Sequence, residues 1–317
     1  MIGEMERELP SEPMKLQQRA AFPRTRLHAD ILLLVTATIW GTAFVVQRMV
    51  ANQIGVITFT GLRFLIGGIV LLPLAWRSLQ GHGWKLAGAS AVLGAILFGG
   101  AALQQLGLQT TTAANAGFIT GTYVIIIPIL MAVFWQKRQR FWVWVAACMA
   151  LGGLFLLSTG GRMTQVNSGD LFELVGAFFW AMHVILVGRF VRQFPALPLA
   201  VGQFLMCGII GISAGFAWEG VAVEGLRASW WAVLYTGMLS IAVGYTFQVV
   251  AQQIAPPADT AIILNGEAVM AAISGWIILN ERLGAVQIAG CGLILAGILV
   301  SQIDGTVKVR KGMGEKG

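Results

Sequence analysis

The sequence predicts an all-α integral membrane protein with ten transmembrane helices, arranged as two inverted five-helix repeats. Three observations support this fold class. The composition is too apolar for a water-facing surface, ten apolar windows are long enough to cross a bilayer, and the second half of the chain repeats the first.

The composition argues against a soluble protein. Apolar residues make up 57% of the 317 residues and charged residues 11%, whereas soluble domains contain about 25% charged residues. The strict alternation of polar and apolar residues that is typical of a β-barrel is absent. Cys148, Cys207 and Cys291 lie in apolar windows without the spacing of metal ligands, so we predict no disulfide, no metal site and no redox role.

A transmembrane helix needs about 20 mostly apolar residues. Ten windows, numbered here as spans 1 to 10, meet this requirement: 31–50, 57–76, 88–108, 114–135, 141–159, 171–188, 197–218, 230–251, 260–280 and 284–303. We assign the first repeat to 31–159 and the second to 171–303. Residues 1–30, which lack the apolar core of a signal peptide, and the basic residues 304–317 are predicted to be cytoplasmic tails.

The charges predict the orientation. With ten spans and a cytoplasmic N-terminus, sixteen Lys and Arg residues lie inside, four lie outside, and Arg63 lies within a span. Cytoplasmic loops of membrane proteins carry such an excess, so both termini are predicted to be cytoplasmic. The net charge of +7 is thereby explained without a nucleic-acid partner. The four outside residues are Arg48, Arg162, Arg227 and Arg282.

Two register shifts superpose the halves of the chain. A shift of 140 residues places "GLRFLIGGI" over "VGQFLMCGI" in the early spans, and a shift of 144 fits the later ones. Matched pairs include Trp40 with Trp180, Arg63 with Gln203, Gly100 with Gly244, Gln104 with Gln248, and Tyr123 with Glu267. Because each half has an odd number of spans, the second half enters the membrane upside down. Inverted repeats are typical of secondary transporters.

Three stretches also carry a family resemblance: "IWGTAFVVQRMV", "TTAANAGFITGTYVIIIPIL" and "WIILNERLGAVQIAGCGLILAGILVS". Over residues 30–303 the chain resembles the drug/metabolite transporter (DMT) superfamily, and more narrowly bacterial carriers with two EamA domains. The resemblance implies an inner-membrane carrier of small metabolites or drugs, with spans 3, 4, 8 and 9 near a central cavity. Family members often have Glu-Pro in span 9, whereas Ala268 follows Glu267 here, which leaves a break in that helix open.

Glu267 is the first candidate for the substrate or proton pathway. A charge in hydrocarbon costs at least about 2.5 kcal/mol, so Glu267 either faces a water-accessible cavity or is held by donors that join helices. Thr260, Ala271 and Ser274 share its helix face, which is smaller and more polar than a lipid-facing side. The other candidates in the pathway are Tyr123, Gln104, Gln248, Trp40, Trp180, Arg63, Tyr245 and His183.

Each of these candidates also has a structural explanation. Arg63 binds an anionic group or extends its long stem to the interface. The glutamines line a pore or bridge helices. The two tryptophans lie mid-span, away from their usual place at the interface, and either stack on a substrate or pack. His183 takes a proton or bonds a carbonyl.

We therefore expect a secondary active transporter, proton-coupled, that moves a small metabolite, amino acid or drug across the inner membrane, with export favoured over import. A lipid flippase subunit or a membrane-embedded partner protein is the alternative. An enzyme is disfavoured because the histidines are scattered. The chain has no nucleotide-binding P-loop, and no cofactor is expected. Small-residue faces at Ala146/Ala150 and Gly292/Ala296 serve either a homodimer or internal packing.

Overall fold

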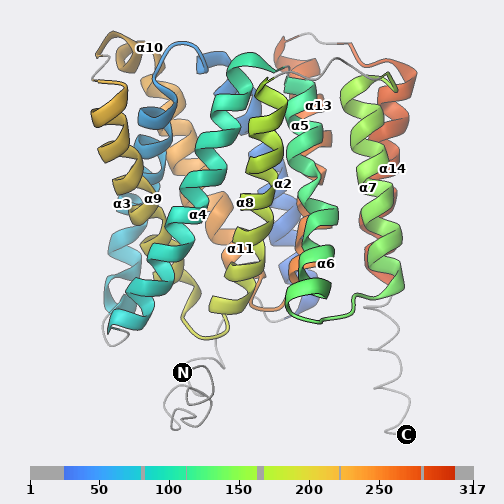
Figure 1. Ribbon diagram of the computed structural model, residues 1–317, viewed down its shortest axis with the longest axis horizontal. Coiled ribbons are helices and arrows are strands. Elements are labelled where there is room, and N and C mark those ends of the chain that lie inside the picture. The colour runs from blue at the N-terminus through green and yellow to red at the C-terminus, as the bar shows by residue number, and fades with distance from the viewer. Residues whose placement is uncertain are drawn as a thin grey trace, which may run out of the picture.

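The computed structural model describes residues 25–79, 83–111, 113–162, 168–220, 223–279 and 282–303. Within these ranges the chain is helical and contains no strand. The helices stand side by side in one bundle (Figure 1). Two parts of the predicted tails lie outside the described residues: 1–24 of the N-terminal tail and all of the C-terminal tail, 304–317.

Seven spans are single helices, and three are interrupted. The single helices are α2 (Arg26–Val50), α3 (Val56–Leu79), α4 (Gly83–Thr110), α7 (Phe141–Thr159), α8 (Ser168–Phe190), α9 (Ala196–Trp218) and α14 (Ala285–Ser301). Span 4 consists of α5 (Ala113–Gly121) and α6 (Tyr123–Phe134), and span 9 of α12 (Pro257–Leu264) and α13 (Gly266–Leu279). Span 8 consists of α10 (Val223–Tyr235), η2 (Thr236–Tyr245) and α11 (Thr246–Ala251).

Nine of these spans are long and apolar enough to cross a membrane, as judged from the described residues, and α14 is a shorter apolar helix. The predicted all-α membrane fold is thus confirmed. Helix α2 begins at Arg26, before the predicted apolar window, and a salt bridge of 2.7 Å joins Arg26 to Asp30 one turn later. The side chain of Thr25 caps this first turn by accepting from the backbone N–H of His28.

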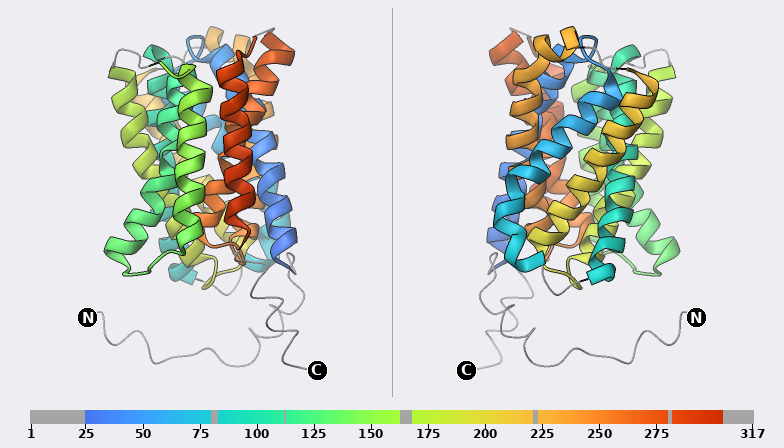
Figure 2. Two further views of the ribbon diagram at one scale, coloured as in Figure 1. Left: turned by 90° about the vertical axis from the view of Figure 1, so that its right-hand side faces the viewer. Right: turned by 90° about the vertical axis from the view of Figure 1, so that its left-hand side faces the viewer.

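The first turn of α2 and the last turn of α14 lie at the same end of the bundle (Figure 2). We call this the proximal end and the opposite one the distal end. Since consecutive spans alternate in direction, eight of the Lys and Arg residues that the structure describes fall at the proximal end and four at the distal end. The arrangement has the charge asymmetry that the sequence predicts.

Helices pack against their repeat mates. Helix α3 packs against α9 at one flank of the bundle, and α7 packs against α14 at the other (Figure 1). Helix α4 packs against α8, and the equivalent contact joins α2 to η2 and α11. Each contact therefore has a counterpart in the other half, as two inverted repeats require.

Small residues allow the close contact of α7 with α14. A Cβ at Gly153 would lie 2.7 Å from the Gly290 carbonyl oxygen, and one at Gly297 would lie 3.0 Å from that of Ala146. The predicted face of α7 is correct, since Ala146 and Ala150 are buried there. On α14, Gly292 is exposed and so does not pack within the chain, and its place in a homodimer stays a prediction. The small residues of α7 serve packing within the chain.

Spans 4 and 9 are interrupted within one residue of equivalent positions, at Thr122 and Asn265. Each interruption has a glycine beside it, Gly121 or Gly266, and glycine weakens a helix by about 0.5–1 kcal/mol. The Asn265 side-chain amide donates to the Gly121 carbonyl oxygen over 3.5 Å, and these two residues are repeat mates 144 positions apart. The break that the resemblance left open is therefore present, without a proline after Glu267.

Candidate functional site: a central cavity between the repeats

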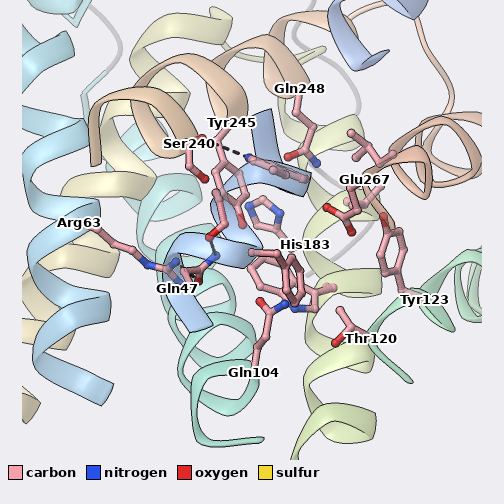
Figure 3. A pocket seen from close by; sticks show the side chains of 16 residues that line it. Gln47, Arg63, Gln104, Thr120, Tyr123, His183, Ser240, Tyr245, Gln248 and Glu267 are labelled. Carbon is pink, nitrogen blue, oxygen red and sulfur yellow. Dashed lines mark hydrogen bonds between the residues drawn. The ribbon is translucent and has the colours of Figure 1, made fainter. Parts of the chain in front are cut away.

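A cavity of about 50 Å³ lies between the two halves, and we call it the central cavity. All nine candidate residues from the sequence analysis line this cavity, although they belong to eight different helical segments (Figure 3). They are Trp40, Arg63, Gln104, Tyr123, Trp180, His183, Tyr245, Gln248 and Glu267. The sequence analysis did not single out the remaining lining residues, Ala43, Phe44, Gln47, Thr120, Val184, Ser240 and Leu264.

Glu267 lies in the first turn of α13. Negative charge is favoured there by the helix dipole, by about 0.3–1 kcal/mol at exposed sites. No described residue donates a hydrogen bond to its carboxylate or forms an ion pair with it. The Tyr123 side chain, which follows the break in span 4, lies beside it and points towards it (Figure 3). The carboxylate thus faces the cavity and does not join helices.

Tyr245 is the centre of an aromatic cluster. The centroid of its ring is 4.4 Å from that of Trp40. It is stacked on Trp180 at 6.3 Å and 28°, and it meets His183 edge-on at 6.1 Å. Such pairs contribute about 0.5–1.5 kcal/mol beyond the area that they bury. Both mid-span tryptophans therefore pack and line the cavity at once.

The cluster depends on the π-helix η2. In an α-helix, residues five apart lie on different sides, but a π-helix brings them onto nearly the same side because its hydrogen bonds join such residues. Ser240 and Tyr245 are five apart, and both line the cavity. The Ser240 carbonyl oxygen accepts a hydrogen bond of 3.2 Å from Trp40 Nε1. Nothing in the hydropathy of span 8 indicates this wider turn.

Two polar contacts join helices beside the cluster. His183 Nε2 is 2.8 Å from Gln203 Oε1, so His183 bonds a carbonyl oxygen, that of a side-chain amide. Gln248 donates to Gln252 Oε1 over 3.2 Å, and Gln252 donates to the Val184 carbonyl over 2.8 Å. Gln252 therefore joins the end of α11 to α8, and Gln248 lines the cavity and supports Gln252 from within the same helix.

Arg63 is buried, with 4% of its surface exposed. It donates a hydrogen bond to Gln47 Oε1, and its guanidinium lies 5.3 Å from the ring centroids of Phe59 and Phe64. The alternative in which Arg63 extends to the interface is therefore wrong. Its side chain is held inside the protein and directed into the cavity.

A second cavity of about 240 Å³, here called the side cavity, adjoins the first at Phe44, Thr120 and Glu267. It extends towards the distal end, where Arg48 and Gln287 line it. At the proximal end, Asp259 accepts from both Arg26 and Arg140 at 2.9 Å. The structure is therefore more open on the distal side of Glu267 than on the proximal side.

Sequence reasoning missed several residues of the site. Gln47 could have been found, since it lies seven residues after Trp40 and so on the same face of the helix. Glu173 is a fully buried carboxylate, at 0% exposure, and it accepts from Thr120 over 2.6 Å. It was missed because it lies at the start of its apolar window, where charges are ordinary.

Comparison with known proteins decides the family. The EamA-like transporter family matches residues 27–159 and 167–302, one copy in each half. The chain belongs to this family. As an EamA-family protein of the DMT superfamily, it is a multi-pass membrane transporter and not an enzyme.

Relatives of this EamA-family transporter span nearly its whole length. An uncharacterized transporter of Archaeoglobus fulgidus is 30% identical over 289 residues, which are 90% of this chain and 89% of that protein. The threonine/homoserine exporter RhtA of Escherichia coli is 27% identical over 293 residues, covering 89% and 92%. A crystal structure at 18% identity has the same fold, with a TM-score of 0.74 over 88% of this chain and 98% of that one.

Proposed function

We propose that this EamA-family transporter exports small zwitterionic metabolites, amino acids above all, in exchange for protons, from a bacterial inner membrane with both termini in the cytoplasm. The observation that carries the proposal is Glu267, an acidic residue without a hydrogen bond or ion pair from the described residues, at the cavity between the repeats. The similarity to the threonine/homoserine exporter RhtA supports the substrate class and the direction.

The lining of the central cavity suits a small amphipathic molecule. Five tryptophan, tyrosine and phenylalanine side chains and three aliphatic ones form its apolar part, and eight polar side chains, four from each repeat, converge on it (Figure 3). Small-molecule sites commonly combine an apolar lining with a few placed polar groups. Apolar atoms of the substrate would contact the rings of Trp40, Trp180 and Tyr245, while its ammonium group would meet Glu267.

The exchange of substrate for protons is explained if the Glu267 carboxylate binds either the proton or the ammonium group of the substrate. Closing the cavity around an uncompensated carboxylate is costly in a membrane. A bound proton or a bound ammonium group removes that cost, but both cannot occupy Glu267 together. The two repeats would therefore move, and open the cavity to the other side of the membrane, only when Glu267 holds either a proton or the ammonium group of the substrate. Substrate would leave from the side cavity as a proton enters.

The test is transport by the purified protein in proteoliposomes. Threonine and homoserine are supplied with and without a pH gradient, for the wild type, Glu267→Gln and the control Glu224→Gln, whose side chain is exposed on α10. We expect the gradient to drive transport in the wild type and the control. Glu267→Gln should fold but lose gradient-driven transport. Wild-type dependence on the gradient in Glu267→Gln would contradict the proposal.

A further inference from the structure

Arg63 is a buried cation that forms no ion pair with any residue that the structure describes. The ion pairs among the described residues join Arg26 and Arg140 to Asp30 and Asp259, all at the proximal end. None reaches Arg63, which lies 4% exposed on the cavity wall. Removing an ion from water costs several kcal/mol unless partners compensate it. Any compensation must therefore come from the side chains around Arg63.

These neighbours satisfy the guanidinium only in part. A guanidinium has five N–H donors, and the described residues provide one hydrogen-bond acceptor, Gln47 Oε1. The rings of Phe59 and Phe64 contribute cation–π attraction from 5.3 Å. The buried Nε has no partner among the described residues. Donor capacity thus remains on a side chain that lines the cavity.

The repeat shows that bridging helices at this position does not need a charge. The repeat mate of Arg63 is Gln203. Arg63 joins α3 to α2 through Gln47, and Gln203 joins the equivalent pair, α9 and α8, through His183 at 2.8 Å. An amide therefore suffices as the bridge in the second half. The positive charge of the first half calls for another role.

Arg63 and Glu267 lie on opposite sides of the central cavity, with Tyr245 between them (Figure 3). We infer that Arg63 is the anion-binding subsite of this cavity and holds the carboxylate of a zwitterionic substrate whose ammonium group is directed towards Glu267. A planar guanidinium is the side chain best suited to bind a carboxylate. This inference rests on the proposed function and adds which end of the substrate each residue binds.

The test compares threonine with threoninamide, in which a neutral amide replaces the carboxylate. Affinity is measured for both on the purified full-length protein, as wild type, Arg63→Gln and Arg63→Lys. Arg63→Gln copies the residue of the second repeat, so it can still donate to Gln47. We expect the wild type to bind threonine at least about tenfold more tightly than threoninamide. Arg63→Gln should lose that preference through weaker threonine binding, and Arg63→Lys should recover part of it.

Two results would overturn the inference. One is a wild-type protein that binds both compounds equally, a result that needs no variant to fold. The other is an Arg63→Gln variant, with the thermal stability of the wild type, that keeps the full preference for threonine. The transport test on Glu267 is separate. If the preference for threonine over threoninamide depends on Arg63 while Glu267→Gln keeps transport driven by the pH gradient, the anion-binding subsite stands and proton exchange through Glu267 is rejected.

Discussion

Trp40 lies directly against Gly244, so close that a Cβ on Gly244 would be 2.7 Å from Trp40 Nε1. The repeat mates form the same contact: a Cβ on Gly100 would be 3.2 Å from the Trp180 ring. Each tryptophan thus packs against a glycine of the opposite half. The two contacts hold the halves together beside the central cavity, and they explain why both indoles lie far from the interface.

This contact predicts a graded loss of stability. Gly244→Ala forces Trp40 to move, and such overpacking costs about 1–3 kcal/mol. Gly100→Ala, with more room, should cost less. Gly292→Ala is the matched control, because a Cβ there meets nothing within 4 Å. The midpoints of thermal unfolding in detergent rank the three variants by stability. Equal midpoints for Gly244→Ala and Gly292→Ala would refute the prediction.

The salt bridges at the proximal end predict a gate. Asp259, 2% exposed, binds Arg26 of α2 and Arg140 at the start of α7. Asp259→Asn removes the charge that holds these ends together and should favour opening on the proximal side. A cysteine at position 248 should then react faster with a thiol reagent applied from that side. Arg192→Gln, an exposed change at the same end, is the control; equal rates in both variants would exclude the gate.

The sequence predicted the repeat and the cavity for a physical reason. Apolar windows set the spans, two register shifts set the symmetry, and symmetry places mid-span polar residues of both halves at one interface. The nine candidates therefore lie around one cavity. Their roles in transport remain proposals that the experiments above test.

Other features depend on contacts that the sequence does not display. The interruption at Asn265 involves a partner 144 residues away, and the π-helix η2 has the hydropathy of an ordinary span. Asp259 and Glu173 lie close to the ends of apolar windows, where a charge normally meets water. Their burial results from the packing of other helices over them, which is a long-range effect.

The orientation of the chain is the next prediction. From the charge asymmetry we predict that the proximal end, and with it both termini, faces the cytoplasm. Reporter fusions after residues 138 and 311 should show a cytoplasmic signal, and fusions after residues 162 and 225 a signal from outside. An outside signal after residue 311 would contradict the even number of spans.

The central claim is that substrate occupies the cavity beside Glu267, and protection of cysteines from labelling tests it most directly. In a background without Cys148, Cys207 and Cys291, single changes Gln104→Cys, Gln248→Cys and Ala271→Cys are labelled with a small membrane-impermeant thiol reagent. Glu224→Cys, exposed at the distal end, is the control. We predict that all three cavity positions react and that threonine slows their reaction but not that of the control. Unreactive cysteines at all three positions beside a reactive control, or labelling that threonine leaves unchanged, would contradict the account.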